Sequence, residues 1–241
     1  MVQRLDKLLA DAENCTRSQA RAMIRRGEIS VDGAVVRDSG WKADPDKQEI
    51  TLYGRPVCTG PCYIMMNKPV GVVSSTSAGE ETTVLDLLPA SLRRKGLFPA
   101  GRLDKDTTGF MLITNDGAFA HEILSPRRHV EKEYVAQLEH PADLSDVQVF
   151  ARGMALPDGT VFDPGRLELD ETRMKATVII QEGRYHQVKR MFEFVGNNVL
   201  CLKRIRIGGL YLDERLAPGE ARFLMPEEVL RIRNPLSPPG C

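Results

Sequence analysis

Two carboxylates lie in a short polar run that could perform acid, base or nucleophilic chemistry. Asp104 and Asp106 belong to PAGRLDKDTTGF, residues 99–110, in which glycines bracket charges of both signs. A strand-like apolar run follows, and a tight polar loop on a rigid strand is a common place for catalytic groups. A structural role fits equally well, because Asp104 could cap a turn while the threonines satisfy backbone groups. The spacing alone leaves both interpretations open.

A second run, EGRYHQVKRMF at residues 182–192, could direct cations at a carboxylate or a phosphate. On a helix, His186, Lys189 and Arg190 would share one face. The plainer interpretation is a cationic surface helix. Glu182 and His186 are too few for a metal site, and no other ligand has suitable spacing, so we expect no metal.

Basic residues also precede an aromatic residue in SPRRHVEKEY, residues 125–134. Tyr134 would begin a strand, and its ring could simply belong to the core. An aromatic face with cations nearby is also what the recognition of an unstacked RNA base requires. The sequence does not decide between the two.

The N-terminal part predicts two short helices and a hairpin. Thr16 and Gln19 have capping-box spacing and Gly27 suits a helix end, so a helix is expected between them. Asp32-Gly33 between β-prone runs predicts a two-residue hairpin. The helix contains four arginines with no acid between them: Arg17, Arg21, Arg25 and Arg26. They could form a solvated face or contact an RNA backbone, because guanidinium groups suit phosphate geometry.

The composition bounds the class of protein. Of the 241 residues, 42% are hydrophobic and 27% are charged, which predicts a packed core. No apolar run approaches the roughly 20 residues of a membrane helix, and the acid-containing N-terminus is unlike a secretory signal. A formal net charge of zero argues against bulk nucleic-acid binding but permits local basic faces. Five scattered cysteines without a CxxC pair fit a reducing cytosol, so we expect a cytoplasmic protein.

Several common catalytic motifs are missing from the sequence. It contains no G-x-x-x-x-G-K-[ST], no G-x-S-x-G and no H-E-x-x-H. Nucleotide hydrolysis, serine-hydrolase chemistry and zinc-protease chemistry are therefore not leading hypotheses.

The elements that must position these residues form two modules. Glycines and prolines concentrate in residues 46–62, which we interpret as a linker between a module at 1–45 and a domain at 63–232, followed by a flexible tail at 233–241. In the larger domain, helices are expected at 118–124 and 186–195, within a total of two or three. Strands are expected at 63–66, 70–74, 109–114, 134–138, 176–180 and 199–207. Because strands outnumber helices without βαβ spacing, we predict an α+β domain around a mixed, largely antiparallel sheet with flanking helices.

Together these runs resemble the RsuA-type pseudouridine synthases over nearly the whole chain. The resemblance places an S4-type RNA-binding module at residues 4 to about 45 and a synthase domain from 63 to about 232. The EGRYHQ run resembles the small-subunit branch, because large-subunit relatives tend to have Asn-Arg in place of Tyr185-His186. Phe110 is a small departure, since many members carry Leu there. The matching runs are NKPVG at 67–71, GRLDKDTTGF at 101–110, SPRRHVEKEY at 125–134, EGRYHQVKRMF at 182–192 and RIGGLYLDERLAPGE at 206–220.

The resemblance also implies roles for individual residues. Asp104 would be the catalytic aspartate, Tyr134 would pack against the uracil, and Lys189 would pair with the aspartate. Arg102 would help to hold the flipped nucleotide. Further substrate-binding residues would be Leu103, Asn67, Lys68, His186 and Gln187, and the RNA-binding residues would be Arg17, Arg21, Arg25 and Arg26.

The implied reaction converts one uridine of 16S ribosomal RNA to pseudouridine with base flipping. It breaks C1′–N1 and forms C1′–C5 without a redox step, so no cofactor is expected. The expected partner is 16S rRNA or a small-subunit assembly intermediate, bound by a monomer away from any membrane. Two alternatives stay open: the same chemistry on 23S rRNA, and a non-catalytic RNA-binding protein of ribosome assembly.

Overall fold

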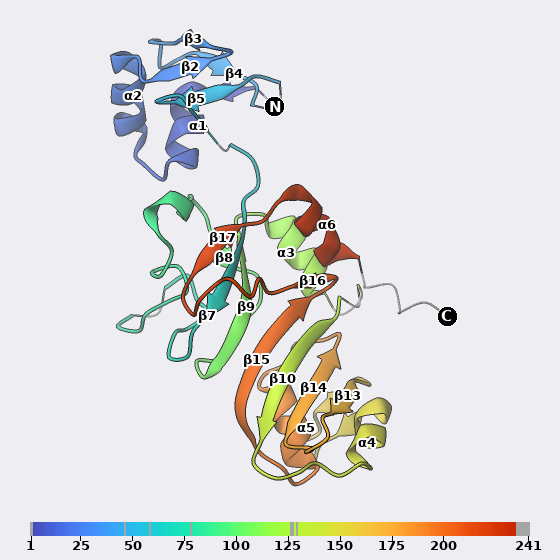
Figure 1. The fold of residues 1–241 in the computed structure, drawn as a ribbon. Coiled ribbons are helices and arrows are strands. Elements are labelled where there is room, and N and C mark those ends of the chain that lie inside the picture. Colours follow the sequence, from blue (N-terminus) through green and yellow to red (C-terminus); the bar gives the residue numbers. More distant parts are fainter. Residues whose placement is uncertain are drawn as a thin grey trace. The chain divides into compact units, whose positions relative to one another are not determined.

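The fold was determined as a computed structural model. The structure describes residues 2–45, 47–57, 59–77, 79–125, 128 and 130–234. The chain forms two compact units (Figure 1). The first comprises Met1–Cys62 with Pro89–Leu97, and the second comprises Tyr63–Leu88 with Phe98–Cys241. Most of the expected tail, residues 235–241, lies outside the described residues, as do 126, 127 and 129 of the SPRRHVEKEY run.

The first unit combines a helix pair with small sheets. Its helices are α1 (Leu5–Ala12) and α2 (Arg17–Arg26), and a 3-10 turn spans Ala90–Leu92. The expected start of α2 is confirmed, because the Thr16 side chain and Gln19 form a capping box, and Gly27 ends the helix with φ +76°. One sheet has the order β3-β2-β5-β6, and a second pairs β1 with β4. The strands are β1 (Gln3–Arg4), β2 (Ile29–Val31), β3 (Ala34–Val35), β4 (Lys42–Ala43), β5 (Ile50–Leu52) and β6 (Arg55–Pro56).

The expected hairpin is present, whereas the expected linker is wrong over much of its length. Asp32 and Gly33 both have positive φ and join β2 to β3. Within residues 46–62, however, β5 pairs with β2, and Ile50 and Val57 are buried in the core of the first unit. The alternation of apolar residues around Ile50 outweighs the local glycine and proline signal, because it completes a sheet over the helix pair.

The second unit is built on one long sheet of mostly antiparallel strands, as expected. Its order is β13-β14-β10-β15-β9-β7-β17, with β16 beside β15 and β8 beside β9; only β15 and β9 pair in parallel. A separate pair joins β11 (Met154–Ala155) to β12 (Val161–Phe162). The sheet strands are β7 (Tyr63–Lys68), β8 (Phe98–Pro99), β9 (Thr107–Thr114), β10 (Lys132–Leu138), β13 (Arg166–Leu169), β14 (Lys175–Ile180), β15 (Val199–Ile207), β16 (Leu210–Tyr211) and β17 (Ala221–Phe223).

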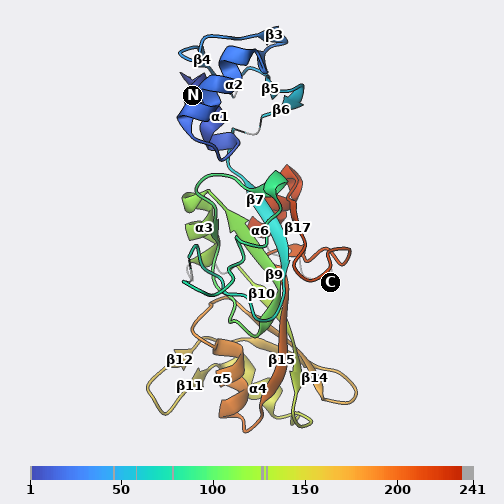
Figure 2. The ribbon, with the colours of Figure 1, turned by 90° about the vertical axis from the view of Figure 1, so that its left-hand side faces the viewer.

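Helices support both halves of this sheet. The described residues of the second unit hold four α-helices, more than the two or three expected: α3 (Gly117–Leu124), α4 (Asp146–Arg152), α5 (Gln187–Phe194) and α6 (Pro226–Arg233). Apolar side chains of α3 and α6 share a buried cluster with β7 and β9. α4 and α5 lie beside the half formed by β14 and β15 (Figure 2), where Phe150 and Phe192 are in ring contact at 5.0 Å between centroids.

The strand expected at residues 70–74 does not form. Val73 makes only an isolated bridge to Thr83. Pro69 lacks an N–H donor and Gly71 adopts φ +85°, so the chain turns away from β7 instead of continuing a ladder. The resulting loop lies against the run that contains Asp104, because the Gly71 N–H donates to the Lys105 carbonyl at 2.7 Å.

No helix among the described residues is both long enough and apolar enough to span a membrane.

Candidate active site

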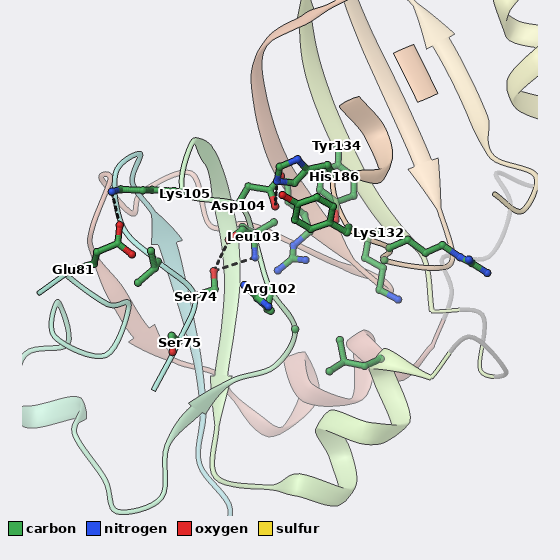
Figure 3. Close-up of a pocket in the computed structure, with 17 residues that line it drawn as sticks. Ser74, Ser75, Glu81, Arg102, Leu103, Asp104, Lys105, Lys132, Tyr134 and His186 are labelled. Atoms are coloured by element: carbon green, nitrogen blue, oxygen red, sulfur yellow. Dashed lines mark hydrogen bonds and ion pairs between the residues drawn. The ribbon is translucent and has the colours of Figure 1, made fainter. Parts of the chain in front are cut away.

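Asp104 lies at the edge of a pocket of about 760 Å3 in the second unit (Figure 3). It belongs to a tight turn directly before β9, closed by a hydrogen bond from the Thr107 N–H to the Asp104 carbonyl at 3.1 Å. Residues from this loop, from β10, from β15 and from the segment before α5 line the same pocket. The Asp104 carboxylate is partly exposed to it, so an RNA substituent could reach its oxygens.

An imidazole and an ammonium group flank the Asp104 carboxylate. His186 Nε2 is 3.5 Å from Oδ1, and Lys189 Nζ is 3.6 Å from Oδ2. Lys189 was expected to pair with Asp104, but its closer contacts are with both oxygens of Asp106, at 2.6 and 2.7 Å. The Lys189 hydrogen bonds and then its charge lower the pKa of Asp106. Lys189 therefore bridges the two carboxylates instead of serving Asp104 alone.

Lys68 lies beneath this loop and not on the pocket surface, contrary to the expected contact with substrate. Its side chain is fully buried. Nζ donates to the carbonyls of Asp104 at 2.9 Å and Thr107 at 2.8 Å, with longer contacts to Pro69 and Lys105. Burial lowers the pKa of Lys68 to about 8, an effect that the charges of Asp104 and Asp106 partly oppose. A buried ammonium so engaged holds the loop in shape.

Asn67 and Gln187, also expected at the substrate, are likewise buried and occupied. Asn67 Nδ2 donates to the Leu216 carbonyl at 2.8 Å. Gln187 Nε2 donates to Glu182 Oε1 at 2.6 Å, and its Oε1 accepts from the Arg184 N–H at 3.1 Å. Gln187 borders a narrow side pocket of about 50 Å3 next to Asp104, but its amide groups are already paired. Its role in the structure is to fix the segment that leads into α5.

Tyr134, Leu103 and Arg102 do line the main pocket, as expected. Tyr134 is on β10, with most of its ring buried, so only part of it faces the cavity. Leu103 is fixed by Ser74, whose Oγ donates to the Leu103 carbonyl at 2.8 Å and accepts from its N–H. Arg102 is exposed and has no hydrogen bond or ion pair with any described residue, so it can meet a ligand.

His186 owes its position to an unusual backbone. It adopts φ +50° just before α5, which begins at Gln187 and not at His186 as expected. Its ring stacks on Tyr185, with centroids 3.8 Å apart and an interplanar angle of 17°. Figure 3 shows His186 beside Asp104 and Tyr134. Tyr185 and His186 therefore line the pocket with two stacked rings.

Two further pocket residues did not stand out in the sequence, Lys132 and Arg204. Both are buried and both line the cavity that contains Asp104. Lys132 is inside the SPRRHVEKEY run, two residues before Tyr134, so strand alternation could have placed the two on one face. Nothing local marks Arg204, because only the pairing of β15 with β10 brings it opposite Tyr134.

The α2 arginines (Arg17, Arg21, Arg25 and Arg26) lie on the first unit. Asp6 of α1 is fully buried and accepts hydrogen bonds from Arg17 at 3.0 Å and Arg21 at 2.9 Å, as well as from Arg4. The sequence showed no acid within α2 itself, and the partner comes from another helix. Arg26 pairs with Glu28, while Arg25 makes no ion pair with any described residue. An RNA-contacting role for these arginines stays a prediction.

The described residues contain no cluster of three or more His, Cys, Asp or Glu side chains that could hold a metal ion. The pocket presents a partly exposed carboxylate, flanked by an imidazole and an ammonium, beside an aromatic ring. A carboxylate in such a place can act as a nucleophile or as a base toward a sugar or a heterocycle.

Comparison with known proteins agrees with this arrangement. Residues 3–48 match the model of the S4 domain, and residues 62–194 match the model described as RNA pseudouridylate synthase. An S4 domain followed by such a domain defines an enzyme that modifies RNA. The chain belongs to the RNA pseudouridylate synthase family.

Relatives of similar length support the same assignment. The chain is 44% identical over 236 residues to the uncharacterized RNA pseudouridine synthase YtzG of Bacillus subtilis, covering 96% of this chain and 99% of the relative. It is 44% identical over 233 residues to ribosomal small subunit pseudouridine synthase A of Escherichia coli K12, covering 95% and 99%. A crystal structure of a pseudouridylate synthase superposes with a TM-score of 0.66 at 35% identity, covering 95% of this chain and 99% of that one.

Proposed function

We propose that this enzyme isomerises one specific uridine of 16S ribosomal RNA to pseudouridine, with Asp104 as the catalytic residue. The observation that supports the chemistry best is the Asp104 carboxylate at the pocket edge, with Lys189 and His186 within 3.6 Å of its oxygens. The choice of 16S rRNA rests on relatives named ribosomal small subunit pseudouridine synthase A, such as those of Escherichia coli and Yersinia pestis.

The reaction makes three demands on the site. The C1′–N1 bond must break, the uracil must rotate, and a C1′–C5 bond must form. Asp104, oriented by the neighbouring ammonium of Lys189, attacks the sugar or base as a nucleophile, or removes a ribose proton on a glycal route. The Tyr134 ring limits where the detached uracil can go, because it borders the cavity beside the carboxylate.

The target uridine must leave its stack to reach this pocket. Flipping costs a few kcal/mol, which contacts with the extruded nucleotide must offset. Arg102 supplies a guanidinium at the pocket surface that pairs with none of the described residues, and Tyr134 supplies an aromatic contact for the base. The α2 arginines would hold the surrounding RNA through its backbone. We place this reaction in the cytoplasm, carried out by a monomer on 16S rRNA or on a small-subunit assembly intermediate.

The test is to map pseudouridines in 16S and 23S rRNA by carbodiimide treatment and primer extension in a strain that lacks this protein. Loss of one 16S site, restored by the wild-type gene and not by Asp104→Asn, is the expected result. The Asp106→Asn gene serves as the matched control and should restore the site. Loss of a site in 23S rRNA alone would move the substrate to the large subunit. An unchanged map in both RNAs would favour a non-catalytic role in ribosome assembly.

A further inference from the structure

Two buried cations in the Asp104 pocket have no anionic partner in the part of the chain that the structure describes. Arg204 is 4% exposed and Lys132 is 5% exposed, and both line the cavity. Arg204 Nε donates to the Phe110 carbonyl at 2.8 Å, but its Nη2 is buried without a hydrogen-bond partner among the described residues. Lys132 Nζ has only two carbonyls, those of Ile123 at 3.2 Å and Gln181 at 3.1 Å. Buried charges in this state are costly, because neighbouring carbonyls do not neutralise them.

The neighbouring Arg206 shows how this same sheet satisfies a buried guanidinium. Arg206 is also buried, and it pairs with Glu133 and Glu131. A bulge between β10 and β15 sets Arg206 opposite Glu133 but sets Arg204 opposite Tyr134. Since adjacent residues of a strand point to opposite faces, Arg204 lies on the face of Tyr134, away from both glutamates. The two glutamates that pair with Arg206 are therefore on the other face of the sheet, and no described carboxylate forms an ion pair with Arg204 or Lys132.

The backbone of Arg204 packs closely against a neighbouring strand, which fixes where its side chain begins. Gly109 of β9 lies beside Arg204 in the parallel pairing, at φ +97°, and a Cβ there would be 2.2 Å from the Arg204 carbonyl. Lys132 is two residues before Tyr134 and thus on the same face of β10. Burial, and to a smaller extent the charge of Arg204, lowers the pKa of Lys132 to about 8. Because Arg204 is opposite Tyr134 and Lys132 is two residues from Tyr134 on the same face, the two cations are near neighbours, and an anion between them would relieve their repulsion.

We propose that Arg204 and Lys132 form a phosphate subsite, which binds the backbone phosphate next to the target uridine. The proposal rests on the proposed function, because it places a polynucleotide in this pocket. A uracil carbonyl could accept from Nη2, but a neutral group would not compensate two buried charges. A phosphate does both, since its oxygens accept from the guanidinium and from the ammonium in charge-assisted hydrogen bonds.

This subsite has a mechanistic consequence. Base, ribose and phosphate of one nucleotide are covalently joined, so fixing the phosphate near Tyr134 restricts where C1′ can lie relative to the Asp104 carboxylate. The contact would be made before the glycosidic bond breaks and kept afterwards. Its main contribution is therefore to binding the extruded nucleotide, and less to the rate of the bound complex.

The experiment is a titration of the full-length protein by NMR with four probes: uridine, uridine 5′-monophosphate, uridine 3′-monophosphate and inorganic phosphate. The wild-type protein should bind at least one monophosphate roughly 10- to 100-fold more tightly than uridine, as a charge-assisted contact implies. Arg204→Gln should lose this preference while binding uridine as before. Arg215→Gln, which removes an exposed arginine outside the pocket, is the matched control and should keep it.

Two further variants keep the test decisive if Arg204→Gln folds poorly. Arg204→Lys retains a positive charge without the planar fork, and Lys132→Met removes the second cation alone. Both should reduce the monophosphate preference in proteins whose thermal unfolding matches the wild type. Equal affinity of the wild-type protein for uridine and both monophosphates would overturn the proposal. So would inorganic phosphate that binds as tightly as the monophosphates but does not compete with them.

These readouts do not depend on turnover or on which RNA is modified. If the 16S map is unchanged in the deletion strain but the monophosphate preference depends on Arg204, the proposed function fails and the subsite stands. If a 16S site is lost but the preference is absent, the subsite fails and the proposed function stands.

Discussion

Replacing Lys68 by methionine tests whether the loop that carries Asp104 is held from beneath. The substitution keeps the length of the side chain and removes the ammonium that bonds to the Asp104 and Thr107 carbonyls at 2.9 and 2.8 Å. Two such charged hydrogen bonds contribute roughly 3–6 kcal/mol to the folded state. Against this, the net fall in the pKa of Lys68 from 10.5 to about 8 means that its surroundings together disfavour the charged form by about 3 kcal/mol. We therefore expect Lys68→Met to lower the free energy of unfolding by roughly 0–3 kcal/mol.

The activity should change much more than the stability. The carbonyls of the Asp104 loop lose their common donor, and a displacement of the carboxylate by about 1 Å can cost about 100-fold in rate. The assay is a single-turnover measurement of pseudouridine formation at saturating RNA, together with urea unfolding of both proteins. A Lys68→Met enzyme with a wild-type single-turnover rate would refute the idea that Lys68 positions Asp104.

The pH dependence of stability gives an independent check on the same lysine. Between about pH 8 and pH 10.5 the unfolded chain still binds the Lys68 proton while the folded protein has released it. Because the unfolded state then binds more protons, the free energy of unfolding rises with pH across this window. The wild-type protein should gain up to about 3 kcal/mol relative to Lys68→Met between these limits. A constant difference between the two proteins from pH 7 to pH 10.5 would mean that Lys68 is not a desolvated cation.

Three other expectations concern charges around the active site and on the first unit. Lys189→Met should lower the single-turnover rate by roughly 100-fold, because it removes the ammonium 3.6 Å from Asp104, whereas Asp106→Asn should retain most activity; equal losses would contradict these roles. Replacing Arg17, Arg21 and Arg25 of α2 with alanine should weaken RNA binding and reduce the slope of log K against log salt by about 0.7–0.9 per lost phosphate contact, as measured by filter binding. Asp6→Asn should lower the free energy of unfolding by about 1–3 kcal/mol at neutral pH. Hydrogen bonds from Arg4 most of all, then from Arg21 and Arg17, lower the pKa of Asp6, so this difference in stability should shrink as the pH falls below about 4. A difference that does not depend on pH would count against the buried ion cluster.

Local signals in the sequence were sufficient where the physics is local. The capping box of Thr16 and Gln19, and the positive φ of Asp32 and Gly33, depend on residues three or fewer apart, and both features formed as predicted. The strand predicted at 70–74 does not form, because the preceding Pro69 lacks the N–H that a ladder needs, and the apolar composition of the segment does not compensate for it. The linker predicted at 46–62 is wrong for the opposite reason. The glycines and prolines near Ile50 indicate a loop, whereas the segment forms β5 by pairing with β2, a partner distant in the sequence.

The candidate site shows the same division. Spacing left a structural role open for both Asp104 and Tyr134, and only the resemblance to pseudouridine synthases assigned a functional role to them. The runs NKPVG and EGRYHQVKRMF mix residues that face the pocket with residues that hold the loops, and spacing cannot separate the two groups. Burial separates them, because Lys68 and Gln187 bond to backbone or to buried side chains whereas His186 faces Asp104. Arg204 could not be found, since its relation to Tyr134 depends on a bulge in the pairing of β10 and β15.

Electrostatic interactions connect the loop that contains Asp104 with two cations of the same pocket, Arg204 and Lys132. Arg204 lowers the pKa of both Lys68 and Lys132, so a single guanidinium influences the lysine under the loop and the lysine at the proposed subsite. The carboxylates of Asp104 and Asp106 offset part of this for Lys68, whereas Lys132 has no such compensation from them. An anion bound at Arg204 and Lys132 would therefore provide these two cations with the negative charge that Asp104 and Asp106 provide to Lys68. Because Arg204 acts on both lysines, a phosphate bound at the proposed subsite would also change the electrostatic environment of Lys68, which holds the Asp104 loop.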